Sequence, residues 1–350
     1  MSGHTTAYES RSPVASRPSS VNAPGEERFL ITGAMGCIGA WVVYNLVREG
    51  VPTAVFDLSD NPHRMRLILS QDEIDRVRFI TGDITDPLAI AQALAETGAT
   101  HVIHLAALQV PFCRADPVLG ARVNVVGTVN LFEAVRQAGD QVRGLAYASS
   151  VAALGPDNFY PQKPVQDDAP LRPDTLYGVY KQANEHTARL YWQDWQVESI
   201  GLRPYIVYGA GRDQGLTSDT AKAILAAAAG RPYHVKFSGP VALQYADDVA
   251  RIFIAAARAE HKGAAVCNLR QDVVDVADFV EALRVEAPDA HITQETNRPL
   301  PFPADLDDSG LRRILGSVPH TQLPAAIRHS LDLFQSLLAQ GRINLQQLDS

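Results

Sequence analysis

Short runs of apolar residues alternate with longer amphipathic stretches from residue 29 to about residue 202. The first run, residues 29–31, ends just before Gly33, and the stretch at residues 40–49 has helical spacing and stops at Gly50. A short run that is apolar at every position is typical of a parallel strand that is buried on both faces. The pattern therefore predicts a buried strand followed by a helix.

The same alternation repeats several times along this part of the chain. Strands joined by helices in this order form right-handed crossovers, which build a parallel sheet that helices cover on both faces. We therefore expect an α/β fold with a doubly wound parallel sheet. Further strands are predicted at residues 54–56, 77–80, 101–105, 144–148 and 199–202, and further helices at residues 87–97, 118–138 and 178–195.

The regular alternation weakens after Arg203, where polar loops and proline-rich segments become common. Residues 265–269 still have the apolar pattern of a strand that fits the first sheet. We therefore predict two lobes, each assembled from separated stretches of the chain. The larger lobe takes residues 28–203 and 244–270, and a smaller, mixed lobe takes residues 204–243 and 271–350.

The first 27 residues are polar and rich in Ser, Pro, Thr and Ala. Such a composition buries too little apolar surface to fold, and it lacks the apolar centre of a secretory signal. We expect residues 1–27 to form a disordered N-terminal extension and the protein to be cytoplasmic.

Composition narrows the class of protein further. Of the 350 residues, 46% are hydrophobic and 20% are charged, which is ordinary for a soluble globular protein. No uninterrupted apolar run comes near the roughly 18 residues that a membrane span needs, and a net charge of -8 argues against nucleic acid as a partner. The three cysteines, Cys37, Cys113 and Cys267, are too far apart to predict a disulfide framework or a metal site.

Three glycines, Gly33, Gly36 and Gly39, lie between the first predicted strand and the first helix. A bound pyrophosphate needs a tight turn, a backbone without Cβ atoms in its way and the free N–H groups of a helix N-terminus. Asp57 ends the second strand, where a carboxylate accepts hydrogen bonds from the adenosine ribose and repels a 2′-phosphate. The pattern predicts a dinucleotide site and favours NAD over NADP.

Other interpretations of this region stay open. Arg64 and Arg66 follow Asp57 closely enough to bind the 2′-phosphate of NADP, and a glycine cluster also forms turns in proteins that bind no nucleotide. Asp83, at the end of the third strand, either accepts a hydrogen bond from the adenine amino group or caps the helix that begins near Pro87.

The fourth strand ends in His104, Leu105, Ala106 and Ala107. Small residues at a strand end let the backbone lie close to a ribose or a nicotinamide. For His104 itself we favour a histidine of the core.

Tyr177 and Lys181 are four residues apart, which places them on one face of the predicted helix. Lowering a tyrosine pKa from about 10 to about 7 takes roughly 4 kcal/mol, and one cation at about 4 Å in an effective dielectric near 20 supplies about that much. We therefore expect Lys181 to activate Tyr177 as a base, with Ser150 at a strand end to bind the substrate oxygen. The alternative is that Tyr177 packs in the core and Lys181 is a solvated charge.

These motifs occur in one order along residues 28–335 and together resemble the extended short-chain dehydrogenase/reductases of the NAD-dependent epimerase/dehydratase type. The resemblance implies a Rossmann domain, bound NAD, a catalytic set of Ser150, Tyr177 and Lys181, and a homodimer formed through helices of the Rossmann domain. The motifs are Gly33-x-x-Gly36-x-x-Gly39, Asp57, Gly82-Asp83, His104-Leu105-Ala106-Ala107, Ser149-Ser150, Tyr177-x-x-x-Lys181, Arg203-Pro204-x-x-Val207-Tyr208-Gly209 and Tyr245-Ala246-Asp247-Asp248-Val249-Ala250. The expected cofactor residues are Gly33, Gly36, Cys37, Ile38, Gly39, Asp57, Asp83, Ile84, Leu105, Ala106, Ala107, Asn124, Tyr177 and Lys181.

Two positions depart from the members of this family that use nucleotide-linked sugars. Those members often carry an Asn and an Arg near the places where this chain has Ile206 and Val241. A diphosphate needs cationic or N–H donors, so this departure favours a small sugar or sugar acid as the substrate. Arg212, in a polar loop that opens the smaller lobe, then either clamps a carboxylate or hydroxyls of such a substrate or lies in solvent paired with Asp213. The expected substrate-binding residues are Gln109, Ser149, Ser150, Tyr177, Tyr205 and Arg212.

Three functions follow as hypotheses. The first is an NAD-dependent oxidoreductase that moves a hydride at a secondary alcohol carbon of a small sugar or sugar acid, with oxidation and epimerisation both open as outcomes. The second is a nucleotide-sugar 4-epimerase or dehydratase. The third is a non-catalytic NAD-binding sensor or scaffold, which has no need of an activated phenol. None of the three involves a metal ion.

Overall fold

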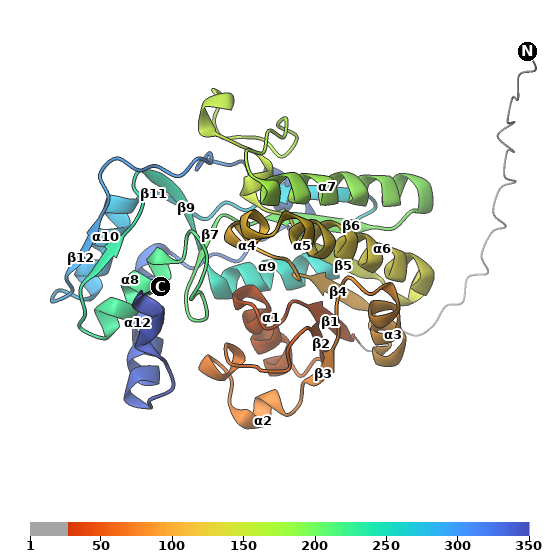
Figure 1. Ribbon diagram of the computed structural model, residues 1–350, viewed down its shortest axis with the longest axis horizontal. Coiled ribbons are helices and arrows are strands. Elements are labelled where there is room, and N and C mark those ends of the chain that lie inside the picture. The colour runs from red at the N-terminus through yellow and green to blue at the C-terminus, as the bar shows by residue number, and fades with distance from the viewer. Residues whose placement is uncertain (1–26, 350) are drawn as a thin grey trace, which may run out of the picture.

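The computed structural model describes residues 27–349 (Figure 1). The predicted N-terminal extension, residues 1–27, lies outside the described residues except for Glu27. The carboxylate of Glu27 forms an ion pair with Arg258 at 2.8 Å. The Arg258 guanidinium in turn lies over the ring of Phe29 at 5.5 Å, so the chain is anchored where the first strand begins.

Seven parallel strands form a large sheet in the order β10-β6-β5-β4-β1-β2-β3. The chain runs outward from β1 to β3, then returns to pair β4 with β1 and continues outward on the other side. In open sheets of this kind a ligand binds at the carboxyl ends of the strands where the direction reverses. The sheet confirms the predicted doubly wound α/β fold. The strands are β1 (Phe29–Thr32), β2 (Thr53–Asp57), β3 (Arg78–Thr81), β4 (His101–His104), β5 (Gly144–Ala148), β6 (Ser199–Arg203) and β10 (Ala264–Asn268).

Helices cover both faces of this sheet because successive side chains of a strand point to opposite sides. Leu30 and Val102 belong to the core under α3, α6 and α7. Their neighbours Ile31 and Ile103 belong to the core under α1 and α9. Each strand is therefore apolar at consecutive positions, as the sequence pattern indicated. The helices are α1 (Cys37–Arg48), α3 (Pro87–Thr97), α6 (Gly127–Ala138), α7 (Leu176–Trp195) and α9 (Ala246–Arg258).

A smaller group of strands and helices lies beside the carboxyl ends of the large sheet (Figure 1). Its main sheet has the order β11-β9-β7, with β7 parallel to β9 and β11 antiparallel to it. Strands β8 and β12 form a separate parallel pair, and α12 packs against α8 and α10. The exact lobe boundaries given above stay a prediction. These elements are β7 (Ile206–Tyr208), α8 (Asp219–Ala228), β8 (Tyr233–Val235), β9 (Pro240–Tyr245), β11 (Asp272–Asp275), α10 (Val276–Glu286), β12 (Ile292–Gln294), α11 (Ser309–Leu315) and α12 (Leu323–Ala339).

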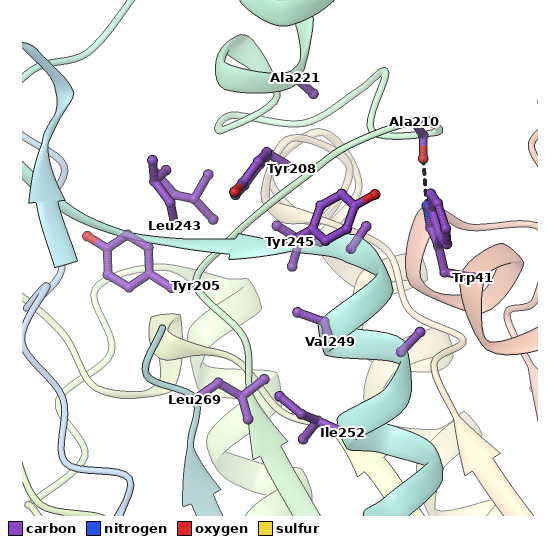
Figure 2. Packing of buried hydrophobic residues seen from close by; sticks show 14 of the residues in the cluster. Trp41, Tyr205, Tyr208, Ala210, Ala221, Leu243, Tyr245, Val249, Ile252 and Leu269 are labelled. Atoms are coloured by element: carbon purple, nitrogen blue, oxygen red, sulfur yellow. Dashed lines mark hydrogen bonds between the residues drawn. The ribbon is translucent and has the colours of Figure 1, made fainter. Parts of the chain in front are cut away.

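Both parts of the molecule share one continuous core. Figure 2 shows the rings of Tyr208 and Tyr245, from the smaller sheet, beside Trp41 of α1. The Trp41 indole also donates to the Ala210 carbonyl at 3.0 Å. Burial of this much aromatic surface fixes the loop that starts at Ala210 against the first helix.

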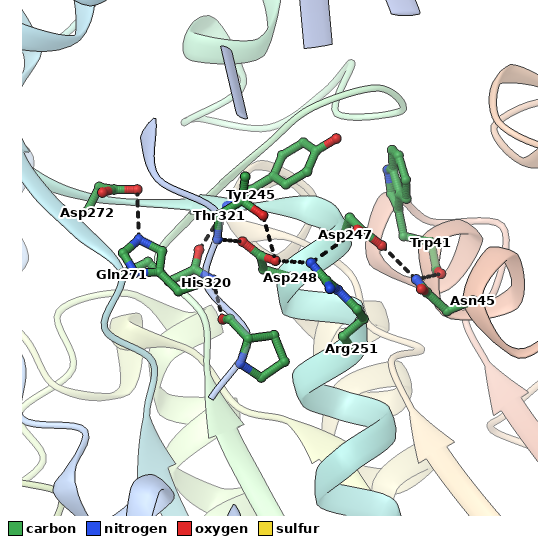
Figure 3. A network of polar contacts seen from close by, with 11 residues as sticks. Trp41, Asn45, Tyr245, Asp247, Asp248, Arg251, Gln271, Asp272, His320 and Thr321 are labelled. Carbon is green, nitrogen blue, oxygen red and sulfur yellow. Dashed lines mark hydrogen bonds and ion pairs between the residues drawn. The ribbon is translucent and has the colours of Figure 1, made fainter. Parts of the chain in front are cut away.

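A polar network at the start of α9 adds to this packing. Figure 3 shows the buried carboxylate of Asp248 paired with Arg251 and accepting from the backbone N–H and the hydroxyl of Thr321. The neighbouring Asp247 accepts from Asn45 of α1 at 2.8 Å. The segment before α12 is thus tied to the helix that connects the two sheets.

The predicted helix at residues 118–138 begins at Pro117 and contains a π-helical segment, Arg122–Val126, before α6. Such a segment adds a residue to one turn, and Asn124 within it hydrogen-bonds both the N–H and the carbonyl of Leu108. Within residues 27–349, the continuous helix Pro117–Gln141 is the one long and apolar enough to cross a membrane by length and composition, and half of its most apolar window is buried inside the protein. Shorter helices occur at Met65–Leu67, Gln71–Ile74, Val110–Ala115, Pro117–Ala121, Gly139–Gln141, Val151–Ala153, Asp157–Phe159 and Leu345–Asp349.

Candidate active site

A cavity of about 450 Å³ opens at the carboxyl ends of the parallel strands, where the smaller sheet and its loops face the large one. Residues from the ends of β1 to β5, from the start of α7 and from the loop after β7 line it. The structure therefore brings together residues as far apart in the sequence as Gly33 and Phe302. Of the predicted site residues, all but Asn124 line this cavity.

The glycine loop lets three backbones come together at the floor of the cavity. A Cβ on Gly33 would lie 2.5 Å from the backbone nitrogen of Ala106, and one on Gly39 would lie 2.5 Å from the Cα of Ala34. Gly33 also has a φ of +71°, which favours glycine. Gly36 is extended and provides no side-chain cap to α1, so the first N–H groups of that helix are available to an anion. This cradle suits a pyrophosphate.

The Asp57 carboxylate is held in place by two backbone N–H groups. It accepts from Met35 at 3.0 Å and from Leu58 at 2.8 Å, at the end of β2 and facing the cavity. Arg64 and Arg66, which the sequence left open as partners of a 2′-phosphate, have other partners. Arg64 pairs with Asp213 at 2.8 Å and Arg66 donates to Asn61.

Asp83 does not cap a helix. Its side chain accepts from the N–H of Thr85, whereas the cap of α3 is Asp86, which accepts from Leu88. The capping interpretation of Asp83 is therefore wrong. Its contact with adenine stays a prediction, and its place on the cavity wall is compatible with that role.

His104 is a core histidine, as expected. Its ring nitrogens contact the hydroxyls of Thr32 at 2.6 Å and Thr128 at 3.1 Å. Burial lowers the pKa of His104 to about 3, so the ring stays neutral. Asn124, which does not line the cavity, holds the Leu108 backbone and so supports the wall that Leu105, Ala106 and Ala107 form.

Tyr177 lies in the first turn of α7, which Thr175 caps by accepting from Gly178. A Cβ on Gly178 would lie 2.2 Å from the carbonyl oxygen of Ala152, so this glycine lets α7 pack against the turn that follows Ser150. The close approach places Ser150 in hydrogen-bonding contact with the Tyr177 phenol. Gly178, which directly follows Tyr177, thus allows the packing that brings the Tyr177 and Ser150 side chains together.

Lys181 points from the next turn of α7 into the same cavity. Its Nζ donates to the Ala148 carbonyl at 2.6 Å and lies 5.6 Å from the centroid of the Tyr177 ring. Burial lowers the pKa of Lys181 to about 8.

The expectation that Lys181 makes Tyr177 acidic is wrong for this arrangement. Burial raises the pKa of Tyr177, and the groups that oppose the rise are the hydrogen bond with Ser150 and the charge of Arg212. The physical reason is that the Lys181 ammonium is turned to the Ala148 carbonyl, while loss of water around the phenol disfavours its charged form.

Arg212 is the cation that faces the phenol. Its Nη2 donates to Thr217 at 3.1 Å, and its buried Nε has no hydrogen-bond partner among residues 27–349. Asp213 pairs with Arg64, so the alternative in which Arg212 lies in solvent paired with Asp213 is wrong. Burial lowers the pKa of Arg212, although a guanidinium keeps its charge at neutral pH.

The other predicted substrate residues line the cavity in different ways. The Tyr205 hydroxyl donates to the Phe302 carbonyl at 3.2 Å, and the side-chain amide of Gln109 lies close to Gly215. Ser149 is buried and donates to Glu185 at 2.5 Å, so its hydroxyl is already engaged.

A second cavity of about 550 Å³ adjoins the first, sharing Pro111 and Leu216 with its lining. Three cations, Lys222, Lys236 and Arg298, line it. They come from α8, from the loop after β8 and from a proline-rich loop, so no sequence motif groups them. Neither this cavity nor the Arg64–Asp213 ion pair was predicted from the sequence, because each depends on residues that are far apart in the chain.

Comparison with known proteins decides the family. The family model described as "NAD dependent epimerase/dehydratase family" matches residues 29–269. The chain belongs to this family. Its cofactor is therefore NAD, and the glycine cradle and Asp57 described above fit that dinucleotide.

Two relatives show the range of reactions in the family. The chain is 33% identical to a UDP-glucose 4-epimerase of Mycolicibacterium smegmatis over 238 residues, which are 65% of this chain and 72% of that protein. It is 34% identical to a D-erythronate dehydrogenase of Cupriavidus necator over 207 residues, which are 56% of this chain and 60% of that protein. The chain is an NAD-dependent enzyme of the epimerase/dehydratase family.

Solved structures share the whole fold. A UDP-glucose 4-epimerase from Thermotoga maritima, solved with UDP-glucose, aligns with a TM-score of 0.77 and 21% identity over 89% of this chain and 99% of that chain. A UDP-glucose 4-epimerase from Thermus thermophilus in complex with NAD aligns with a TM-score of 0.73 and 26% identity over 88% and 99% of the two chains.

Proposed function

We propose that this enzyme oxidises or epimerises a secondary alcohol of a small sugar acid or a closely related polyhydroxylated molecule. The observation that carries the proposal is Arg212, a partly buried arginine near Tyr177 whose buried Nε has no hydrogen-bond partner among residues 27–349. A buried N–H group without an acceptor is costly, and a carboxylate supplies the missing hydrogen bond together with a charge that complements the guanidinium. A sugar acid held by Arg212 has its hydroxyls beside Tyr177.

NAD, when bound, supplies the hydride acceptor or donor for this chemistry. The first turn of α1 would hold the pyrophosphate and Asp57 the adenosine ribose. Lys181 and the segment Leu105–Ala107 would hold the nicotinamide half, since they line the cavity next to Tyr177.

Ser150 and Tyr177 act on the alcohol oxygen of the substrate. Their contact lets one substrate oxygen approach both, so Ser150 orients it while Tyr177 removes or returns its proton. Because burial raises the pKa of Tyr177, the phenol is mainly a proton donor near neutral pH. Alcohol oxidation should therefore speed up as the pH rises through the acidic limb of the rate profile.

The test is a panel of aldonates, uronates, neutral sugars and nucleotide sugars, incubated with enzyme and NAD. Turnover of a sugar acid, with a much higher kcat/KM than the neutral sugar of the same length, supports the proposal. Stoichiometric NADH release identifies a dehydrogenase, and an isomerised product without net NADH identifies an epimerase. Equal turnover of acid and neutral sugar would refute the role given to Arg212.

A nucleotide-sugar 4-epimerase or dehydratase is the second candidate, and one observation favours it. The adjoining cavity brings Lys222, Lys236 and Arg298 to one place beside a single carboxylate, Asp219, and this excess of cations offsets the lack of the expected Asn and Arg at Ile206 and Val241. A diphosphate is attracted by such a group of cations. Turnover restricted to nucleotide sugars in the same panel would select this function over the first.

A non-catalytic sensor is disfavoured because Ser150, Tyr177 and Lys181 meet in one cavity.

We also propose a homodimer in the cytoplasm. Leu176, Val179 and Leu190 are exposed apolar residues on one stripe of α7, and a second copy of the chain would cover them. Sedimentation of the wild type against Leu190→Asp tests this, because a dimer through α7 should then dissociate.

A further inference from the structure

A buried polar network lies directly behind the catalytic residues. Its centre is Glu185, which follows Lys181 by one turn of α7 and Tyr177 by two, so all three side chains lie on one face of the helix. Glu185 is 6% exposed. Its Oε1 accepts from the Ser149 hydroxyl at 2.5 Å, and its two oxygens accept from the Nε and Nη2 of Arg203, each at 2.8 Å.

The network continues from Arg203 to the loop that leads into α7. The Arg203 Nη1 donates to the Asp167 carbonyl at 2.9 Å and to the Asn268 side chain at 3.1 Å. The Asn268 N–H in turn donates to the Asp167 carboxylate at 2.7 Å. One set of contacts thus joins the ends of β5, β6 and β10 to α7 and to the segment between Ser150 and Tyr177.

Stability alone does not explain a charged pair in this place. An apolar pair of similar volume often stabilises a core as well as a buried ion pair does, because charges lose their hydration on burial. A bidentate ion pair differs from an apolar contact in its fixed geometry. Glu185 has that geometry, and it contacts the residue that precedes catalytic Ser150 in the chain.

We propose that Glu185 is a positioning residue for the reaction proposed above, acting through Ser149 to fix the backbone at Ser150 and acting along α7 on Lys181. The inference rests on the proposed function for its kinetic consequences only. It also gives Ser149 a different role from the predicted one, because a hydroxyl that donates to a buried carboxylate orients the strand end instead of binding the substrate.

The charge of Glu185 also acts on Lys181. The ammonium is surrounded by Cys113 of α4, the neutral ring of His104 at the end of β4, the phenol of Tyr177 and Glu185 itself. Burial lowers the pKa of Lys181 to about 8, while Cys113 and Glu185 oppose that change. Removing the Glu185 charge should lower the pKa of Lys181 further. A cationic Lys181 is present below its pKa, so the alkaline limb of activity should move to lower pH.

The decisive variants are Ser149→Ala and Ser149→Thr. Ser149→Ala breaks only the link to Glu185, and we expect kcat to fall at least about tenfold while KM and the affinity for NAD change less than about twofold, since a small displacement of a reacting group has this effect. Ser149→Thr keeps the hydroxyl and should restore most of the loss. A rise in KM at unchanged kcat, or no loss at all, would overturn the proposal in favour of substrate binding or of a purely structural role.

Glu185→Gln provides a readout that needs no substrate. The midpoint of Lys181 methylation against pH should shift below that of the wild type, and the NAD affinity measures whether the site is intact. The matched control is Asp248→Asn, which also removes a buried carboxylate paired with an arginine, but on α9 away from the cavity. Asp248→Asn should lower the melting temperature without moving the Lys181 midpoint. An unmoved midpoint in folded Glu185→Gln contradicts the proposal, and if that variant does not fold, the Ser149 pair decides.

If no substrate in the panel is turned over by the wild type, the proposed function has failed, and the Lys181 midpoint still tests the effect of Glu185. If the wild type is active and the midpoint and the Ser149 kinetics are unchanged, only the inference about Glu185 has failed.

Discussion

Replacing Arg212 by methionine should make the protein more stable and less active at the same time. Methionine has a similar length and no charge, so it fills the space of the side chain without the buried Nε that lacks a partner. A buried polar atom without a hydrogen bond costs about 1–3 kcal/mol. The substitution also breaks the hydrogen bond from Nη2 to Thr217, which reduces the gain in stability. The reduction is only partial, because Thr217 lines the cavity and its hydroxyl can bind water instead.

The size of the stability change follows from the length of the chain. The entropy of unfolding is about 2 cal/mol/K per residue, so for 350 residues a gain of about 1–2 kcal/mol raises the melting temperature by roughly 1–3 °C. Differential scanning fluorimetry of the ligand-free protein resolves a shift of this size. Arg212→Lys also removes Nε but keeps a charge in the site, so it is the matched control and should gain less stability than Arg212→Met.

The cost in activity should be specific to acidic substrates. Loss of a charge-assisted hydrogen bond to a carboxylate is worth about 1.5–3 kcal/mol, so kcat/KM for the best sugar acid should fall roughly 10- to 150-fold in Arg212→Met. The neutral sugar of the same length should change less than about threefold. The reasoning is refuted if Arg212→Met is less stable than the wild type and loses activity equally on acidic and neutral substrates.

Three further predictions test the cofactor site, the helix packing and the buried acid. Asp57→Ala should weaken NAD binding by about tenfold or more through loss of charge-assisted hydrogen bonds, whereas Asp60→Ala, on the exposed loop nearby, should leave a Kd measured by NADH fluorescence unchanged. Gly178→Val should reduce kcat by about a hundredfold while NAD still binds, because its Cβ would lie 2.2 Å from the Ala152 carbonyl and push α7 away from Ser150; wild-type turnover in that variant would contradict the packing argument. Burial raises the pKa of Asp167 to about 6, above its unfolded value, so the folded state binds the extra proton at low pH and loses stability as the pH rises through about 4 to 6. Asp167→Asn should therefore raise the melting temperature more at pH 7.5 than at pH 5. The corresponding gain in the free energy of unfolding is at most about 3 kcal/mol, and an equal change at both pH values would argue against a raised pKa.

The elements that depend on local pattern were predictable from the chain. Strand β1, the glycine loop and α1 follow one another within 20 residues, and each is specified by its own apolar period or by glycines that a backbone contact requires. The same holds for Tyr177 and Lys181, because four residues along a helix place two side chains on one face wherever the helix lies. The predicted helix at residues 118–138 was correct in extent but not in detail, since its π-helical segment depends on the contact of Asn124 with Leu108.

The protonation of the site depends on contacts that no local pattern contains. Tyr177 was expected to be acidic because Lys181 is near it in the sequence, yet burial raises the pKa of Tyr177 and the opposing cation is Arg212. Arg212 and Asp213 are adjacent in the chain, but Asp213 pairs with Arg64, about 150 residues away. Burial and ion pairing both depend on how distant segments pack, so neither was predictable from spacing.

By itself, then, the sequence determined the parallel sheet, the dinucleotide cradle and the residue types of the catalytic set, because these depend on periodicity, turn chemistry and short spacings along one chain segment. Only the tertiary structure decided which charged groups are buried, which of them are paired, and which space a substrate can occupy. The Glu185–Arg203 pair, the unpartnered Arg212 Nε and the second cavity are examples. The physical reason is that hydration and Coulomb energies depend on the distance between atoms in space and on the water that packing removes from around them.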